Sequence, residues 1–231
     1  MGRIFENKNV NDKILYLLGK LSDKKTESKE YANVMYELGK EFGRLILVKV
    51  KNSYKTVALA STVEDADYLG KGIIDMLEEN GKEVLLTVFW NKRFNPNNEN
   101  QLAVAPIIKE FREKRDIDAP VLIVIKSIIS SSCVVRTNLT RLIEESSPEQ
   151  ILVVAPVLLK GAIKSLENEF DTSISKKFDY LYFAEDDKKT QDGLVEPGIG
   201  GDVYKRLGFE GQNAKNKFVP NIVKERRARY L

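Results

Sequence analysis

The sequence predicts an α/β fold in which helices cover both faces of a parallel twisted sheet. Apolar segments of strand length alternate with segments whose apolar residues recur at helical spacing. The strand-like segments, such as residues 121–125 and 151–157, are continuously apolar, which is typical of strands buried on both faces. Helices between such strands return the chain to the same edge of the sheet. We therefore expect one domain over residues 1–231.

The N-terminal part, residues 1–29, is expected to be a helical segment. Apolar residues recur at helical spacing over residues 11–21, and charged residues dominate 23–29. A second helix is expected over residues 30–42, because the Gly43 that follows is typical of a helix C-terminus.

Strands and helices are then expected to alternate as far as residue 184. The predicted strands are residues 45–50, 56–60, 84–90, 121–125, 151–157 and 180–184. The predicted helices are residues 61–79, 102–114, 134–145 and 160–170. Residues 91–101 are rich in asparagine and too polar to pack, so we expect a long loop there.

Composition excludes several kinds of chemistry. The chain has no histidine, which removes His-ligated metals and Ser–His or Cys–His nucleophilic pairs. Cys133 is the single cysteine, and at the head of an apolar helix it is expected to be a packed thiol rather than a nucleophile. No segment is long and apolar enough for a membrane span or a signal peptide, so we expect a cytoplasmic protein without a membrane partner. The net charge of +3 means that nucleic-acid binding would need a local basic patch.

A serine-rich turn at residues 127–132 is the first candidate site. It joins the strand at 121–125 to the helix at 134–145, so backbone amides and hydroxyls gather at a helix N-terminus, where an anion binds favourably. A plain helix cap would explain the serines as well. The candidate phosphate-binding residues are Lys126, Ser127, Ser130, Ser131, Ser132 and Cys133, with Arg136 as an added charge.

Three other loops follow predicted strands, where ligands of parallel sheets bind. Ser61 and Thr62 form either a helix-capping box or a small anion loop. Lys92 and Arg93 are either solubilising charges or cations of a mobile lid that neutralise a pyrophosphate. The glycine-dense residues 193–202 form either a simple turn or a segment whose main chain contacts the edge of a planar ligand.

Together these segments resemble the type I phosphoribosyltransferases, and among them the uracil phosphoribosyltransferases most closely. Residues 125–133, IKSIISSSC, are similar to the family's turn DPMLATGGS, which holds the 5′-phosphate of phosphoribosyl pyrophosphate. Residues 151–157, ILVVAPV, resemble the family's next strand, IVLVAPV. Residues 197–202, PGIGGD, resemble its base-binding segment, PGLGDAGDR, with the aspartate displaced by one place. The likeness spans roughly residues 31–208, and only its last third is specific.

The resemblance implies a nucleotide or phosphoribosyl pyrophosphate-like ligand, Mg²⁺ as cofactor, and chemistry at ribose C1. It assigns Ser130–Ser132 to the phosphate, and Ser61 and Thr62 to the pyrophosphate loop. The base-binding residues that it implies are Pro197, Gly198, Ile199, Gly200 and Gly201, and the catalytic ones are Asp202, Lys92 and Arg93. The sequence also departs from the family: Ile125 and Lys126 stand where the family has an acid that binds the ribose hydroxyls, and serines replace loop glycines.

Two functions stay open. One is a divergent phosphoribosyltransferase-like enzyme that transfers or cleaves at C1 of a nucleotide or nucleobase. The other is a catalytically inactive binding or effector subunit of a bacterial anti-phage, retron-like assembly that contacts nucleic acid. The lost acid and the extended basic tail favour the inactive subunit, and the retained glycine segment favours the enzyme. The basic tail at residues 213–231 either docks on its own or a neighbouring subunit, as in a homo-oligomer, or binds nucleic acid.

Overall fold

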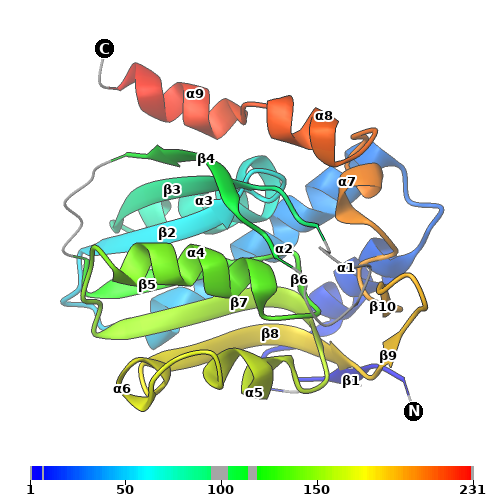
Figure 1. The fold of residues 1–231 in the computed structure, drawn as a ribbon, viewed down its shortest axis with the longest axis horizontal. Helices are drawn as coiled ribbons and strands as arrows, with labels where there is room; N and C mark the ends of the chain where they lie inside the picture. The colour runs from blue at the N-terminus through cyan, green and yellow to red at the C-terminus, as the bar shows by residue number, and fades with distance from the viewer. Residues whose placement is uncertain (1, 7, 95–103, 114–118, 230–231) are drawn as a thin grey trace.

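The computed structural model describes residues 2–6, 8–94, 104–113 and 119–229, and within these it has an eight-stranded sheet (Figure 1). The strand order is β1-β8-β7-β5-β2-β3-β4, with β6 beside β7. The strands are β1 (Ile4–Phe5), β2 (Thr56–Thr62), β3 (Glu83–Asn91), β4 (Ile107–Arg112), β5 (Val121–Ile125), β6 (Ile128–Ile129), β7 (Gln150–Leu159) and β8 (Phe178–Asp186). All of them pair in parallel except β1 and β4, which are antiparallel edge strands. The mostly parallel sheet is confirmed.

Helices cover both faces of this sheet, as predicted. In Figure 1, α4 lies in front of the sheet, and α2 and α3 lie behind it. Side chains of successive strand residues pack into the hydrophobic cores on opposite faces of the sheet. Leu59 belongs to the core on the α1–α3 side, and Ala60 belongs to the core on the α4–α5 side. The helices are α1 (Asp12–Ser22), α2 (Ser28–Lys49), α3 (Lys71–Glu79), α4 (Cys133–Ile143), α5 (Ala162–Glu167), α6 (Thr172–Ser175), α7 (Val203–Arg206), α8 (Gln212–Lys217) and α9 (Asn221–Ala228).

The second helix differs from its prediction. The expected end at Gly43 and the expected strand at residues 45–50 are wrong, because α2 continues without a break to Lys49. Its glycines serve close packing instead. A Cβ on Gly39 would lie 2.3 Å from the carbonyl oxygen of Leu69, and one on Gly43 would lie 2.5 Å from Cβ of Met76. Gly39 and Gly43 therefore let α2 approach α3 and the π-helical turn η1 (Ala66–Gly70) that precedes it.

The predicted helix over residues 102–114 is also wrong. Residues 107–112 form β4, which pairs with β3 in the antiparallel sense, from Thr87 opposite Arg112 to Asn91 opposite Ile107. The exposed edge of β3 offers the hydrogen-bond partners that decide the outcome, because the short apolar pattern of this segment fits a strand as well as a helix. The predicted long loop at residues 91–101 falls mostly outside the described residues, although Phe94 and Val104 form a bridge.

The C-terminal segment docks on its own chain, which was one of the two alternatives for the basic tail. The helices α8 and α9 run along the β3–β4 side of the molecule (Figure 1). Asp67 accepts hydrogen bonds from the amides of Asn221 and Ile222 at the start of α9. The guanidinium of Arg226 is buried and pairs with Glu78 and Glu113. The described part of the chain contains no helix that is long and apolar enough to cross a membrane.

Candidate functional site

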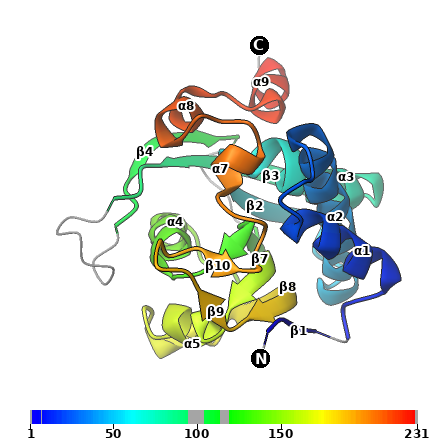
Figure 2. The same cartoon turned by 90° about the vertical axis from the view of Figure 1, so that its right-hand side faces the viewer.

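A cavity of about 470 Å³ lies beyond the carboxyl end of β5. Here the chain order of the parallel strands reverses, since β3 lies on one side of β2 and β5 on the other. Ligands of open α/β sheets bind at such switch points. Figure 2 shows the elements around this end of the sheet: α7 and the hairpin of β9 (Lys188–Lys189) and β10 (Val195–Glu196) lie between α4 on one side and α1 and α2 on the other. The residues that line the cavity include Arg93, Lys126, Ile128, Ser130, Ser131, Val134, Val135, Lys189, Asp192, Gly201, Asp202, Val203, Tyr204 and Gln212.

The serine turn contributes two hydroxyls to this cavity. Ser130 and Ser131 are half-buried cavity residues, and within the described part of the chain neither side chain has a hydrogen-bond partner. Ser132 precedes α4 but points elsewhere, because its hydroxyl donates to Oε1 of Glu169 at 2.9 Å. Cys133 is buried and does not line the cavity. Of the six residues predicted to bind phosphate, Lys126, Ser130 and Ser131 line the cavity, and Ser127, Ser132 and Cys133 do not.

The first turn of α4 lines the cavity and has backbone N–H groups without an intrahelical partner. Its N-cap residue, Ser132, makes no side-chain capping bond. The first intrahelical bond runs from the amide of Arg136 to the carbonyl of Ser132. The amides of Val134 and Val135 precede that bond, and both residues line the cavity. The structure therefore combines helix-terminal donors with the Ser130 and Ser131 hydroxyls, which is an arrangement that suits an anion.

Lys126 does not offer the free cation that the sequence suggested. Its ammonium lies 2.8 Å from Oδ2 of Asp65 and 3.0 Å from Oε1 of Glu64. It also lies 3.2 Å from Oγ of Ser127, whose own amide donates to Asp65. All of these groups are buried. Burial alone would lower the pKa of Lys126, but Asp65 and Glu64 hold it above the ordinary value.

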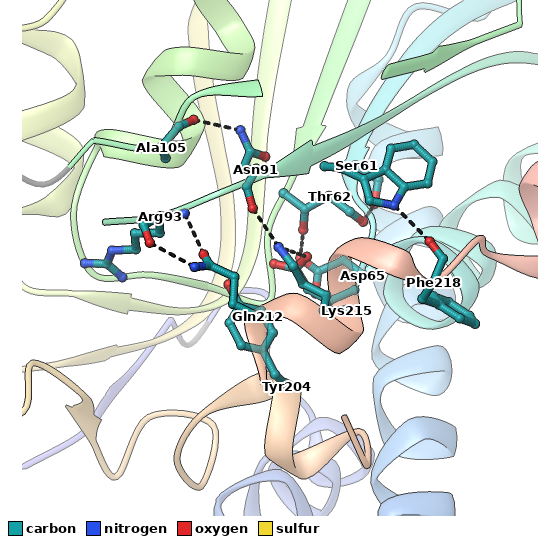
Figure 3. Close-up of polar contacts among 12 residues, drawn as sticks. Ser61, Thr62, Asp65, Asn91, Arg93, Ala105, Tyr204, Gln212, Lys215 and Phe218 are labelled. Carbon is teal, nitrogen blue, oxygen red and sulfur yellow. Dashed lines mark hydrogen bonds and ion pairs between the residues drawn. The ribbon is translucent and has the colours of Figure 1, made fainter. Parts of the chain in front are cut away.

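A second lysine reaches the same carboxylates from the C-terminal segment. Nζ of Lys215, on α8, lies 3.6 Å from Oε2 of Glu64. It donates to the carbonyl of Asn91 at 2.9 Å (Figure 3). It also lies 4.9 Å from the ring centre of Tyr204. Burial lowers the pKa of Lys215, although Glu64 opposes that shift. For Glu64, burial acts upward, but Lys126 and Lys215 outweigh it and lower its pKa.

The loop after β3 brings one of its two predicted cations to the cavity. Arg93 lines the cavity, whereas Lys92 is exposed and does not. The backbone of Arg93 is held by Gln212, whose amide side chain accepts from the Arg93 N–H at 2.6 Å and donates to its carbonyl at 3.0 Å (Figure 3). The Gln212 side chain thus bonds both the N–H and the C=O of Arg93, as a residue of a neighbouring strand would. It ties the position of Arg93 to α8.

Most of the predicted base-binding segment is structural. Gly198 and Ile199 are buried, and the carbonyl of Ile199 accepts from the Tyr31 hydroxyl. A Cβ on Gly200 would lie 2.7 Å from the carbonyl oxygen of Leu21. Of the five residues predicted to bind the base, only Gly201 lines the cavity; Pro197, which is exposed, does not.

Three further predicted residues have clear positions. Asp202 lines the cavity, and its carboxylate accepts from the amide of Tyr204 as the cap of α7. Ser61 and Thr62 are buried and do not line the cavity. The Ser61 hydroxyl donates to the carbonyl of Thr62, and the Thr62 hydroxyl donates to Asp65. Neither hydroxyl caps a helix, because both residues belong to β2 and η1 begins after Asp65 without a side-chain capping bond.

Sequence reasoning missed several residues of this site. The Glu64–Asp65 pair directly after a buried strand was a readable signal for a polar centre at the sheet edge. No comparable signal identified Lys215 or Gln212, because α8 reaches the site only through tertiary folding. The same holds for Lys189 and Asp192, which arrive with the β9–β10 hairpin.

The Mg²⁺ implied by the resemblance does not fit these residues. The described residues contain no group of three or more acids or cysteines that could hold a metal ion. Glu64 and Asp65 do not line the cavity, and both already contact the ammonium of Lys126. The position before Lys126 is Ile125, a buried apolar residue that cannot bind a cation.

No protein-family model matches this sequence, and no curated protein matches it. Among solved structures, the AQ2163 protein from Aquifex aeolicus matches with a TM-score of 0.67 at 14% identity, over 87% of this chain and 97% of that chain. The two chains share a fold. Hypoxanthine-guanine phosphoribosyltransferase from L. donovani matches with a TM-score of 0.42 at 8% identity, over 67% of this chain and 77% of that one. Adenine phosphoribosyltransferase from Thermoanaerobacter pseudethanolicus matches with a TM-score of 0.39 at 10% identity, over 64% and 83%. Nothing in these matches supports the uracil enzymes in particular.

Proposed function

We propose that this chain binds a phosphorylated ribose, such as a nucleotide, in the cavity beyond β5. The observation that carries the proposal is that Ser130 and Ser131, whose hydroxyls have no partner in the described structure, line the cavity together with Val134 and Val135 from the first turn of α4. A phosphate placed there would receive hydrogen bonds from hydroxyls and amides and would meet the positive end of the helix dipole.

The rest of the cavity suits the remainder of a nucleotide. Its volume of about 470 Å³ falls within the ordinary range for small-molecule sites. Asp202 offers carboxylate oxygens to ribose hydroxyls, and Arg93 and Lys189 add positive charge for the phosphate. The apolar side chains of Leu194 and Val203 provide a wall for a planar ring. The cavity thus has serines in the turn before α4, and both charged and apolar residues at α7 and the hairpin.

Binding without transfer is the function that the contacts favour. Transfer at ribose C1 in the manner of the resembled family would use an acid at the end of β5, and this chain has Ile125 and Lys126 there. Because Lys126 also engages Glu64 and Asp65, those carboxylates are occupied. Transfer or cleavage at C1 remains the second candidate, and its support is that Asp202 and Arg93 line the same cavity.

The anti-phage effector role and nucleic-acid binding by the tail remain predictions. Residues 213–231 contain six basic residues, and two of them, Lys215 and Arg226, are buried in ion pairs. They do not contribute to a basic surface.

Calorimetric titration tests the proposal. We expect the wild-type protein to bind ribose 5-phosphate and a nucleoside monophosphate, and the Ser131→Asp variant to bind them at least about tenfold more weakly, because a carboxylate replaces a donor and repels the phosphate. Ser147→Asp is the matched control, since it makes the same change at an exposed position beyond the other end of α4. Equal loss in both variants, or no binding by the wild type, contradicts the proposal. Release of pyrophosphate from phosphoribosyl pyrophosphate would instead establish cleavage at C1, and its dependence on an added nucleobase, with formation of the nucleotide, would establish transfer.

A further inference from the structure

A buried cluster of two carboxylates and two ammonium groups adjoins the cavity through Lys126, the member of the cluster that lines it. Glu64 and Asp65 follow β2, Lys126 follows the adjacent strand β5, and Lys215 enters from α8. Their exposed fractions are 3%, 0%, 8% and 1%. Two positive charges therefore balance two negative charges at the strand ends where the chain order reverses.

The surroundings of Lys126 resemble those of a bound cation. Its Nζ has three oxygen neighbours from three residues, at 2.8 Å in Asp65, 3.0 Å in Glu64 and 3.2 Å in Ser127. An ammonium has three N–H donors, so each oxygen can receive one of them. Carboxylate and hydroxyl oxygens of this kind are also ligands that hard divalent ions prefer.

Two carboxylate oxygens of the cluster accept no hydrogen bond. Oδ1 of Asp65 and Oε2 of Glu64 are buried and have no hydrogen bond, although Lys215 lies 3.6 Å from the Glu64 oxygen as an ion-pair partner. Without the Lys126 ammonium, Glu64 and Asp65 would present four carboxylate oxygens with only one cation nearby. Such a pair would either attract another cation or take up protons.

We infer that Lys126 is a resident cation that takes the place of a divalent metal ion in this site, so that the phosphorylated ligand binds without one. The inference rests on the proposed function for its ligand. It also makes a claim about the chain alone: the Glu64–Asp65 pair is closed to metal ions in the wild type and becomes open to them once the Lys126 ammonium is removed.

Manganese is the probe for the claim about the chain alone, because its binding is measured directly by electron paramagnetic resonance. We expect no Mn²⁺ binding to the wild-type cluster, and we expect Lys126→Met to bind Mn²⁺ at least about tenfold more tightly than the control variant does. Lys71→Met is the matched control, since Lys71 forms an ion pair with Asp75 on α3, outside the cavity. Tighter binding only in the Lys126 variant supports the inference. Wild-type binding that Glu64→Gln abolishes, or a folded Lys126→Met that binds no better than the control, overturns it.

Nucleotide titrations of the wild type test the ligand claim without any variant. We expect the affinity for a nucleoside monophosphate to be the same, within about twofold, in excess Mg²⁺ and in a chelator, because Lys126 already neutralises the carboxylates. An affinity that rises about tenfold with Mg²⁺ overturns the inference. If no nucleotide binds in either condition, the proposed function fails, while the manganese result still decides whether Lys126 excludes a metal ion. If Lys126→Met does not fold, a gain in folded protein with added Mn²⁺ supports the inference, and no gain counts against it.

Discussion

Lys215, near the end of the chain, lies with its ammonium 3.6 Å from Oε2 of Glu64, in the turn that follows the first parallel strand. This pair joins the docked C-terminal segment to the ion-pair cluster of Lys126, which lines the cavity. The single tryptophan reports on the same junction, because the indole N–H of Trp90 donates to the carbonyl of Phe218 between α8 and α9. Docking of the tail and organisation of the site are therefore linked.

Replacing Lys215 with methionine is expected to destabilise the protein. Removing one partner of a buried ion pair typically costs roughly 3–5 kcal/mol, and since Glu64 keeps Lys126 we expect about 3 kcal/mol here. Chemical denaturation followed by Trp90 fluorescence measures the change. Lys217→Met is the control, because Lys217 is exposed on the same helix. Equal stability of the two variants would show that the Lys215 contact contributes little.

The packing of α2 predicts opposite effects for two glycine-to-alanine substitutions. Gly39→Ala places a methyl group against the backbone oxygen of Leu69, which cannot move without shifting η1, so we expect a loss of about 2 kcal/mol or more. Gly19→Ala in α1 meets no atom within 4 Å, and we expect it to stabilise the protein by about 0.5–1 kcal/mol. Thermal unfolding monitored by circular dichroism separates the two. Stabilisation by both variants would refute the close approach of α2.

The lowered pKa of Glu64 predicts how stability depends on pH. Burial raises this pKa, but Lys126 and Lys215 outweigh it, so the folded-state value lies below the ordinary 4.5. A carboxyl group with a depressed folded-state pKa stabilises the fold above its unfolded pKa, and that stability is lost as the pH falls through the folded value. We expect the free energy of unfolding to decrease below about pH 4.5 in the wild type and to decrease less in Glu64→Gln. Urea unfolding measured between neutral and acidic pH tests this, and parallel curves for the two proteins would contradict it.

The thiol of Cys133 is expected to react slowly. It is buried at the start of α4, and burial raises its pKa above the ordinary value. Since the thiolate is the reactive form, we expect a chromogenic disulfide reagent to react at least about tenfold more slowly with the folded protein than with the denatured chain. Equal rates in both states would show an accessible thiol and reopen a chemical role for Cys133.

Much of the fold was readable from the sequence. Continuous apolar runs such as Val121–Ile125 fit few structures other than strands buried on both faces, and the helical spacing of the intervening segments set the alternation. The serine turn was placed correctly at the carboxyl end of β5 because a strand-to-helix junction is a local feature. That this turn lines the same cavity as Gly201 and Asp202 was expected only because ligands of parallel sheets bind at the carboxyl ends of the strands.

The sequence by itself thus determined which segments form the parallel sheet and at which strand ends polar groups gather, because both depend on periods of a few residues. Tertiary structure alone decided that α2 passes through Gly43, that residues 107–112 pair as β4, and that Lys126 faces two carboxylates. These outcomes depend on partners distant in the chain: Met76 against Gly43, the free edge of β3, and Glu64 with Asp65 beside Lys126. Local patterns carry no information about such partners, so whether a lysine is free or neutralised is settled only when the chain folds.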